Sequence, residues 1–238
     1  MNPHRRVVLL DEIRGFCICC MVFYHAFYLF GSQLMWTPGT KLYLFFEPVH
    51  LVFASVFIII SGICTQFSRS VLRRGCILLA LALAISWITI VLLPKLGYSS
   101  FQDRFGILHF LSVSMLIAGA LQKPVQRISP IRGAGICIAL YLLFWYITAK
   151  THVRSPYLFP LGVPCESFYS ADYFPLLPHV FLFGIGVFMG RTILQSPMPD
   201  WIYQPHIAFF SWIGRHTLPV YLLHVPIILL CIYLIERI

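Results

Sequence analysis

The sequence predicts an all-α fold: a polytopic membrane bundle of about seven transmembrane helices that forms a single domain over residues 1–238. Hydrophobic residues make up 59% of the chain and charged residues only 11%, whereas soluble domains average about 45–50% apolar and about 25% charged residues. The apolar residues gather in blocks of about 18 or more with almost no charge, which is the pattern of membrane-spanning helices. A soluble protein could not bury this much apolar surface, so we expect an integral membrane protein.

Seven spans follow one another along the chain. We expect them at about Val7–Phe30, Leu42–Phe67, Gly75–Leu93, Phe105–Leu121, Gly133–Ala149, Tyr173–Leu194 and Leu218–Ile235, the last with a start as early as Phe209. Proline breaks helices, and the prolines expected between these spans are Pro38, Pro94, Pro124, Pro130, Pro156, Pro160, Pro164, Pro197, Pro199 and Pro205. The prolines expected inside helices or at their ends are Pro175, Pro178, Pro219 and Pro226, which neighbouring helices make tolerable in a membrane.

The first apolar block is too long for a signal peptide, carries charges and lacks a small-residue cleavage site, so we expect it to remain as the first helix. The net charge is +9, but the basic residues stand in short loops between the apolar blocks. In that position basic residues set membrane topology. We therefore do not expect a nucleic-acid partner.

The distribution of Lys and Arg predicts the orientation. One side of the membrane receives ten of them, namely Arg5, Arg6, Arg69, Arg73, Arg74, Lys123, Arg127, Arg132, Arg191 and Arg215. The other side receives six, namely Lys41, Lys95, Arg104, Lys150, Arg154 and Arg237. Because basic loops stay in the cytoplasm, we expect a cytoplasmic amino terminus and an outer carboxyl terminus in the cell inner membrane.

The first span, which begins LDEIRGFCICCMVFYH, carries ionisable residues that are costly in a bilayer and often functional. Arg14 and His25 are eleven positions apart, which at 100° per residue leaves them about 20° from the same helix face. Asp11 stands three positions before Arg14 and shares that face. His25 lies about 16 Å deeper than Arg14. These residues are candidate catalytic groups; a structural Asp11–Arg14 ion pair and a core histidine are the alternatives.

A second set of acids and histidines belongs to the outer half of the predicted bundle or, for the last of them, to its middle. Its members are Glu47, His50, Asp103, His109, Asp172, His179 and His224. Each could be an ordinary interfacial anchor. Their common side favours an outer cavity for general acid–base chemistry on a hydroxyl or amine, because histidine titrates near neutral pH and a carboxylate can fix its tautomer.

The inner side carries arginines whose planar guanidinium matches phosphate. They are Arg69, Arg73, Arg74, Arg191 and Arg215. They are candidates for binding a phosphate-bearing donor, and an ordinary positive-inside loop is the alternative. The small residues Gly186, Gly190 and Ser61–Gly62 are interpreted as sites of close helix packing.

Seven of the eight cysteines lie in apolar blocks and Cys165 in a loop. Cys17 and Cys20 form a C-x-x-C pattern, but no second pair stands at metal-ligand spacing. We expect neither a disulfide framework nor a metal.

Five blocks in order resemble a known family. LDEIRGFCICCMVFYH is similar to the opening of membrane-bound acyltransferases, in which an Arg, ten residues and a His mark helix one, here Arg14 and His25. VFIIISGICTQFSRSVLRRG is similar to their second block. RFGILHFLSVSML, ADYFPLLPHVFLFGIGVFMGR and WIGRHTLPVYLLHVPII resemble the bacterial branch related to heparan-alpha-glucosaminide N-acetyltransferase. The resemblance covers nearly the whole chain.

The resemblance implies transfer of an acetyl group from cytoplasmic acetyl-CoA to an amine or hydroxyl of a saccharide on the other side of the membrane. It makes His25 the general base or a transient acyl carrier, with Arg14 positioning it or contacting the donor. Arg69, Arg73 and Arg74 become candidates for the CoA phosphates.

Three features depart from the family's pattern. The animal enzyme has its active histidine in the loop after helix one, where residues 31–40 here hold none. The inner arginines follow an R-x3-R-R spacing rather than R-x-x-R. The chain is also shorter than the animal enzyme, so a cell-wall or envelope glycan is a more suitable acceptor than heparan sulfate.

The rival hypothesis is a proton-coupled transporter or exporter, in which intramembrane histidines and acids relay protons. It predicts inverted repeats, and the sequence has none. A membrane scaffold with purely structural polar residues is a third hypothesis. The sequence leaves the acceptor, the acyl chain and a homo-oligomeric state open; membrane lipids are the one partner that the composition requires.

Overall fold

The structure, a computed structural model, describes residues 6–95, 97, 102–151, 155–196 and 198–237. Arg5 and Arg154 of the charge count and Pro197 among the helix breakers lie outside the described residues. Helices make up the regular structure of the part that is described, joined by one isolated bridge between Phe105 and Tyr173. The predicted all-α membrane fold is confirmed.

Six described helices are long and apolar enough to cross a membrane: Val8–Gln33, Thr37–Thr65, Val71–Lys95, Pro130–Lys150, Leu176–Gln195 and Thr217–Ile235. A seventh, Ile107–Ala120, is apolar but shorter. Each corresponds to one of the seven predicted spans.

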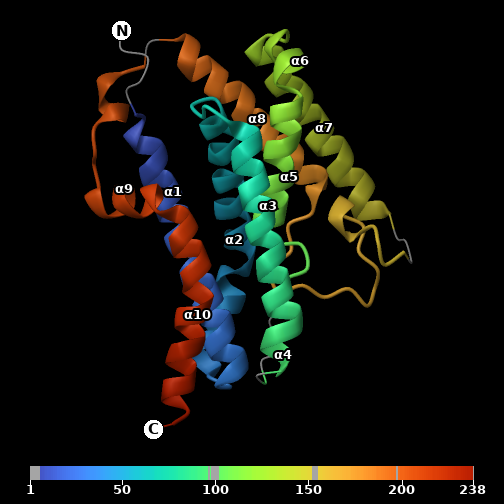
Figure 1. Cartoon of the computed structure of the whole chain (residues 1–238), viewed down its shortest axis with the longest axis vertical. Helices are drawn as coiled ribbons and strands as arrows, with labels where there is room; N and C mark the ends of the chain where they lie inside the picture. Colours follow the sequence, from blue (N-terminus) through green and yellow to red (C-terminus); the bar gives the residue numbers. More distant parts are fainter. Residues whose placement is uncertain (1–5, 96, 98–101, 152–154, 197, 238) are drawn as a thin grey trace. The chain divides into compact units, whose positions relative to one another are not determined.

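The helices are labelled as in Figure 1. In chain order they are α1 (Val8–Gln33), α2 (Thr37–Thr65), α3 (Val71–Trp87), the π-helical turn η1 (Ile88–Leu92), α4 (Leu93–Lys95), α5 (Ile107–Ala120), α6 (Gln122–Gln126), α7 (Pro130–Lys150), the 3₁₀ turn η2 (Phe159–Leu161), α8 (Leu176–Gln195), the 3₁₀ turn η3 (Asp200–Tyr203), α9 (Ala208–Arg215) and α10 (Thr217–Ile235).

Several helix starts differ from the predicted ones. Pro38 does not separate spans but lies in the first turn of α2, where its missing N–H costs no intrahelical hydrogen bond. α5 begins at Ile107 and α8 at Leu176, after the predicted starts at Phe105 and Tyr173, because Gly106 and Pro175 at the two N-caps have extended backbones. The early start suggested near Phe209 is a separate helix, α9, because His216 leaves the helical conformation with φ −114° and ψ 29°.

The chain forms two compact units, and the predicted single domain stays a prediction. Unit 1 comprises Met1–Phe57 and Pro197–Ile238, and unit 2 comprises Ile58–Ser196. The boundary falls within α2, so that helix contributes its first part to unit 1 and its last turns to unit 2.

In unit 1, α1 packs against α9 and α10 (Figure 1). The α1–α9 contact is a backbone-to-backbone approach, since a Cβ at Gly15 would lie 2.0 Å from the carbonyl oxygen of Phe210. A Cβ at Gly214 would lie 1.7 Å from the carbonyl oxygen of Asp11. Glycine at both positions therefore brings the start of α1 next to α9.

In unit 2, α3 packs against α5 and α7 against α8 (Figure 1). The last turns of α2 meet α8 through small residues: a Cβ at Gly62 would lie 2.1 Å from the carbonyl oxygen of Phe183, and one at Gly186 would lie 2.0 Å from that of Ile59. Gly190 likewise faces the carbonyl of Ile63. The packing role predicted for these glycines is confirmed.

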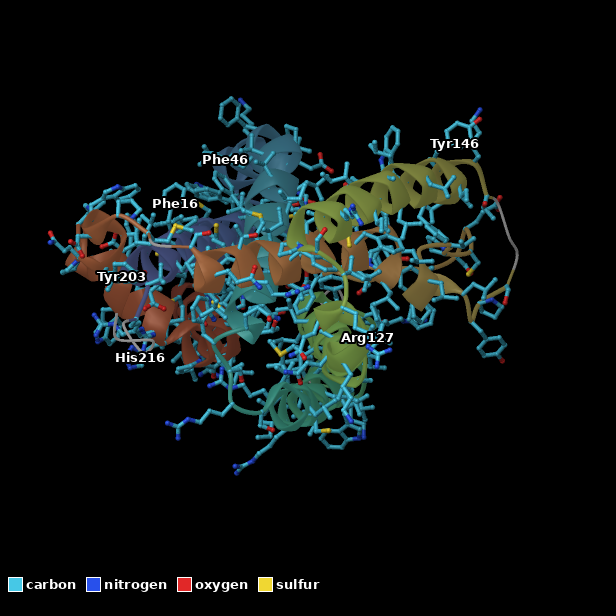
Figure 2. The ribbon with its side chains drawn as sticks, turned by 90° about the horizontal axis from the view of Figure 1, so that it is seen from above. Phe16, Phe46, Arg127, Tyr146, Tyr203 and His216 are labelled. Carbon is cyan, nitrogen blue, oxygen red and sulfur yellow. The ribbon has the colours of Figure 1, made fainter. Side chains whose placement is uncertain are left out.

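Large apolar side chains cover the outside of the helices, as lipid contact requires. Figure 2 shows Phe46 of α2 and Tyr146 of α7 projecting away from their helices, and both are exposed. On α1, Phe16 and Phe23 are exposed, whereas Asp11 and His25 are buried. The polar stripe of α1 therefore faces protein.

We predict that Gly186→Ala destabilises unit 2 by roughly 1–3 kcal/mol, because its methyl group would overlap backbone that cannot move aside as a side chain can. Thermal melting in detergent, followed by size-exclusion chromatography, measures the loss. Gly135→Ala in α7 is the matched control: nothing lies within 4 Å of its Cβ position, so it should be neutral or stabilising by about 0.5–1 kcal/mol. Equal melting temperatures for the two variants would contradict the packing described.

Candidate functional site

A hydrogen-bonded pair of histidines lies in unit 1 between α1 and α10. His25 Nδ1 is 2.8 Å from His224 Nε2, and the two rings stack at a centroid distance of 5.1 Å and an angle of 15°. Both residues are only 6% exposed. Sequence reasoning found both histidines but not their pairing, because they are 199 positions apart.

The backbone fixes the tautomers of this histidine pair. His224 Nδ1 contacts the carbonyl oxygen of Tyr221, one turn earlier on α10. A carbonyl only accepts, so His224 carries its proton on Nδ1, and a neutral His224 then accepts at Nε2 from His25 Nδ1–H. The lone pair of neutral His25 is therefore on Nε2, the nitrogen that can take up a proton.

Aromatic residues of α1 and α2 lie beside the pair. The ring of His50 stacks on Tyr24 at 4.4 Å, and Tyr43 approaches Tyr24 at 5.0 Å. His50 Nδ1 contacts the backbone carbonyl of Glu47. The Glu47 side chain is exposed, so the structure brings His50, but not the Glu47 carboxylate, close to α1.

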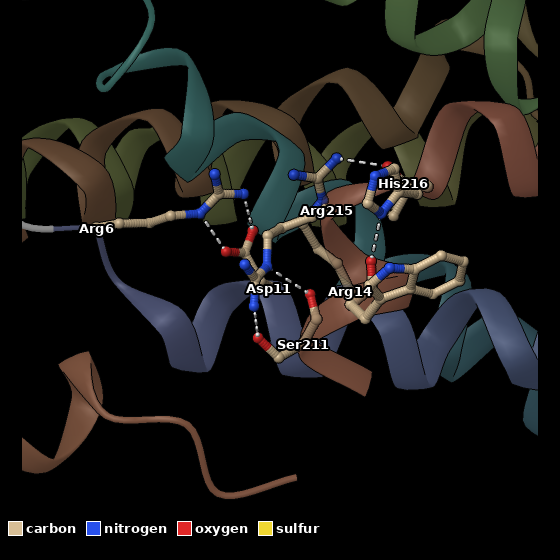
Figure 3. Close-up of polar contacts among 8 residues, drawn as sticks. Arg6, Asp11, Arg14, Ser211, Arg215 and His216 are labelled. Carbon is tan, nitrogen blue, oxygen red and sulfur yellow. Dashed lines mark hydrogen bonds and ion pairs between the residues drawn. The ribbon is translucent and has the colours of Figure 1, made fainter. Parts of the chain in front are cut away.

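Asp11 and Arg14, predicted neighbours on one helix face, take separate partners (Figure 3). Arg6 binds Asp11 through two guanidinium nitrogens, with Nη2 3.0 Å from Oδ1. Arg14 Nη2 donates to Thr217 Oγ1 at 2.9 Å, at the first residue of α10. Asp11 and Arg14 therefore do not form the ion pair that was the structural alternative.

Arg215, at the end of α9, completes a basic cluster with Arg6 and Arg14. Its Nε and Nη2 donate to the backbone oxygen and hydroxyl of Ser211 at 3.2 and 3.1 Å. The contact between Gly214 and Asp11 keeps this end of α9 beside the start of α1 (Figure 3). The Nε of Arg14 is buried and has no hydrogen-bond partner. The cluster therefore offers donors to an anion.

Glu12 is a residue that sequence reasoning missed. Its Oε1 accepts from the backbone N–H groups of His206 and Ile207 at 2.6 and 2.9 Å, and its Oε2 contacts the His206 ring. These amides stand at the N-terminus of α9, where a negative charge is favourable. The available signal was a second acid directly after Asp11 in an apolar helix.

In unit 2, the carboxyl groups of Asp103 and Asp172 meet at the start of α5. The Oδ2 of Asp172 accepts from the N–H of Ile107 at 3.1 Å. The position of a Cβ on Gly106 would lie within 2.8 Å of both Asp103 oxygens and of Asp172 Oδ2. Burial and the neighbouring charge of Asp172 raise the pKa of Asp103, and a hydrogen bond from Gly106 N–H opposes this only in part.

His109 adjoins this carboxylate pair through hydroxyl groups that sequence reasoning did not single out. Ser86 Oγ donates to the carbonyl of Asp103 at 2.6 Å and lies 3.2 Å from His109 Nε2. Thr89 Oγ1 accepts from the N–H of Asp103 at 3.1 Å. Because the only hydroxyl proton of Ser86 goes to the carbonyl, His109 donates from Nε2 and carries its lone pair on Nδ1.

The comparison with known families decides the affiliation of the chain. The family model described as heparan-alpha-glucosaminide N-acetyltransferase, catalytic, matches residues 6–226. The chain belongs to this family. No curated protein and no solved structure matches it.

Membership in the heparan-alpha-glucosaminide N-acetyltransferase family confirms the resemblance found in the sequence. The family consists of membrane acetyltransferases that use acetyl-CoA and a sugar acceptor. The matched range includes both histidines of the pair, the basic cluster and the carboxylate pair. The position of the chain within the family, including the bacterial branch, stays a prediction.

Two other residues that the sequence singled out, Arg191 of the inner set and His179 of the outer set, bind backbone carbonyl groups. Arg191 donates to the backbone carbonyls of Val125, Gln126 and Ile128 at 2.7–3.1 Å, so its guanidinium holds α6 and the start of α7. His179 donates to the carbonyl of Pro175 at 3.1 Å between aromatic rings.

The three other inner arginines, Arg69, Arg73 and Arg74, are exposed and make no side-chain hydrogen bond or ion pair within the described part of the chain. Across the same described residues, no group of three His, Cys, Asp or Glu could hold a metal ion, and all eight cysteines are free thiols.

We predict that Asp103→Asn flattens the pH dependence of thermal stability. Because the pKa of Asp103 is higher in the folded than in the unfolded protein, stability is greatest below the ordinary aspartate pKa, about 3.9. It falls as pH rises through the raised pKa. Asparagine keeps an acceptor for Gly106 N–H but cannot ionise. Melting temperatures from acidic to alkaline pH test this. Glu166→Gln, at an exposed acid before α8, should leave the profile unchanged; a wild-type slope in Asp103→Asn would contradict the assignment.

Proposed function

We propose that this protein transfers an acetyl group from cytoplasmic acetyl-CoA to an amine or hydroxyl of an extracytoplasmic saccharide, with His25 as the general base. The observation that carries the proposal is the buried His25–His224 pair. An ionisable group inside a membrane helix is costly unless it faces protein and has a function. Here the pair also has a defined tautomer, which places the basic lone pair on Nε2 of His25.

The reaction needs a proton acceptor at the attacking atom. As the amine or hydroxyl bonds to the thioester carbonyl carbon, its proton passes to Nε2 of His25. The C–S bond then breaks, and the CoA sulfur takes that proton from the imidazolium. No other group is consumed, and His25 returns to its starting state.

His224 acts on the reaction through His25 and is a positioning residue. Its Nε2 accepts from His25 Nδ1, which orients the imidazole and stabilises the positive charge that His25 gains. The Tyr221 carbonyl keeps His224 in the tautomer that can do this. In a Ser-His-Asp triad a buried carboxylate has this orienting and charge-stabilising role; here a neutral imidazole has it.

The basic cluster of unit 1 is the proposed contact for the CoA phosphates. Arg14 and Arg215 present guanidinium donors, and arginine is well suited to bidentate phosphate contact. Asp11, which was a candidate catalytic residue, positions Arg6 instead. A separate proposal is that Arg69, Arg73 and Arg74 of unit 2 bind the same phosphates. Arg191 donates to backbone carbonyls, which indicates a structural role.

The charge distribution in unit 2 supports an orientation with the amino terminus in the cytoplasm. Contacts between Gly75 and Leu116, and between Arg191 and Gln126, join the helix ends that carry the basic residues. These residues are Arg69, Arg73, Arg74, Lys123, Arg127, Arg132 and Arg191. Residues 58–102, 104–165 and 173–196 contain no Asp or Glu, so no acidic side chain offsets the positive charge at this end. The carboxylate pair lies at the opposite ends of α3 and α5. The positive-inside rule then makes the basic end cytoplasmic in the cell inner membrane, with an envelope glycan as acceptor.

We predict that His25→Ala lowers acetyl-CoA turnover at least ~100-fold, the usual contribution of a general base. CoA release by purified protein, with and without a saccharide acceptor, is the measurement. His224→Asn should give a smaller loss, roughly tenfold for one buried hydrogen bond to a charged group, together with a shifted pH profile.

His206→Ala is the matched control for these histidine variants, because Glu12 keeps its two backbone hydrogen bonds to α9 without that ring. Melting temperatures identify variants that fail to fold. If folded His25→Ala turns over acetyl-CoA like the wild type, the proposed mechanism is wrong. Proton-coupled solute flux in vesicles with no CoA release would favour the transporter hypothesis instead.

We predict that Arg14→Gln and Arg215→Gln raise the KM for acetyl-CoA roughly tenfold each, the effect of losing one charge-assisted hydrogen bond, with a smaller change in kcat. Lys41→Gln, an exposed base in α2 of the same unit, is the control. The triple replacement of Arg69, Arg73 and Arg74 by Gln tests the second set independently. If the KM for acetyl-CoA is unchanged in the variants of one set, that set does not bind the CoA phosphates.

A further inference from the structure

We infer that α9 and the turn before it form an interfacial helix, with one face embedded between the headgroups and acyl chains of the membrane leaflet at the amino-terminal end of α1. The partner of this face is the glycerophospholipid of that leaflet. The segment runs from Asp200, the first residue of η3, to Arg215 at the end of α9, and it belongs to unit 1. The inference goes beyond the proposed function and does not depend on it.

One face of the segment consists of large apolar side chains. Four of them are each more than half exposed, namely Trp201, Ile207, Phe209 and Trp212. Phe209 and Trp212 are three positions apart and therefore lie on the same face of α9. Soluble surfaces rarely keep such side chains together, whereas tryptophan is enriched where a membrane meets water. The face therefore suits the boundary between headgroups and acyl chains.

The opposite face of α9 is fixed to α1. Ser211 is fully buried, and the backbone of Gly214 approaches the backbone of Asp11. The ring of Phe210 meets the ring of Phe16 edge-on, with a centroid distance of 5.5 Å. α9 therefore packs one face against protein and presents the apolar face outward.

Two connections set the depth of α9 in the membrane. Its contacts on α1 are at Asp11 and Gly15, which lie about 5 and 10 Å along the helix axis from Val8, the first residue of that span. Only His216 separates α9 from Thr217, the first residue of the α10 span, so at most about 7 Å joins the two helices. An interfacial helix buries its apolar face about 5–10 Å into this layer. The face of α9 therefore continues the lipid-facing surface.

Side chains satisfy backbone groups at both ends of α9. Glu12 accepts from two backbone N–H groups just before the helix. At the other end, the carbonyl of Ser211 accepts from Arg215 Nε at 3.2 Å. The carbonyl of Trp212 accepts from His216 Nδ1 at 2.9 Å (Figure 3). Helix ends in water can leave these groups to solvent, but in a water-poor layer they need partners from the protein.

The test is the depth of Trp212 in phosphatidylcholine vesicles that contain the full purified chain. A sole-tryptophan variant keeps Trp212 and has Phe at the four other tryptophan positions, which are Trp36, Trp87, Trp145 and Trp201. Lipids brominated near the headgroup should quench most of its fluorescence. Lipids brominated near the end of the acyl chains should quench it less, and iodide in the water should quench it little.

The matched control keeps Trp87 as the sole tryptophan. Trp87 is about as exposed as Trp212, but it lies about 12 Å along the axis from the nearer end of the span Val71–Lys95. It should therefore show the reverse order of quenching by the two brominated lipids. Melting temperatures in detergent verify that both variants fold.

Two outcomes for Trp212 would overturn the inference. Strong quenching by iodide would mean that the face of α9 lies in water. Failure of all three quenchers would mean that a protein surface, such as a second copy of this chain, covers it.

A second measurement uses the wild-type protein and no substitution. The chain is reconstituted with phosphatidylcholine that carries a photoactivatable group next to the headgroup. After illumination, mass spectrometry should find lipid adducts on peptides from residues 198–216. Adducts on peptides of α7 with none on this segment would overturn the inference. Neither measurement involves acetyl-CoA, so both results are independent of whether His25 catalyses the transfer.

Discussion

The hydrogen bond between His25 and His224 is the interaction on which the proposed chemistry of this acetyltransferase family member depends. Two imidazoles inside membrane helices are tolerable only if each satisfies the other and neither faces lipid. The Tyr221 carbonyl removes the ambiguity that a histidine pair would otherwise have. A symmetric pair could exchange donor and acceptor, whereas this one has a single neutral arrangement, with the basic nitrogen on His25.

The geometry of unit 1 follows from contacts that bring distant parts of the chain to α1. Gly15 and Gly214 allow two helix backbones to touch, and Glu12 holds the first amides of α9. Arg14 reaches the first residue of α10. The same short segment that opens the chain therefore both positions α10, which carries His224, and supplies the basic cluster.

Unit 2 separates its charges along the helix axes. Exposed arginines gather where α3 begins and α5 ends, and the carboxylate pair lies at the start of α5. An acid pair at a helix N-terminus is stabilised by the free amides there, while arginines beyond the apolar blocks remain in water. This polarity suits the proposed reaction, in which a phosphate-bearing donor binds on one side of the membrane and a saccharide on the other.

The sequence by itself determined the membrane fold and the approximate spans, because hydropathy and helical periodicity are local properties. It identified His25, His224, Asp103 and Asp172 as unusual in their surroundings. The helix starts near Pro38, Gly106 and Pro175 were harder to predict from the sequence, since proline and glycine occur both just before a helix and in its first turn. Only the tertiary structure decided the partners: His25 with His224, Arg14 with Thr217 rather than Asp11, and Glu12 with α9. Those contacts join residues that are far apart in sequence, and they depend on the packing of whole helices, which no local pattern encodes.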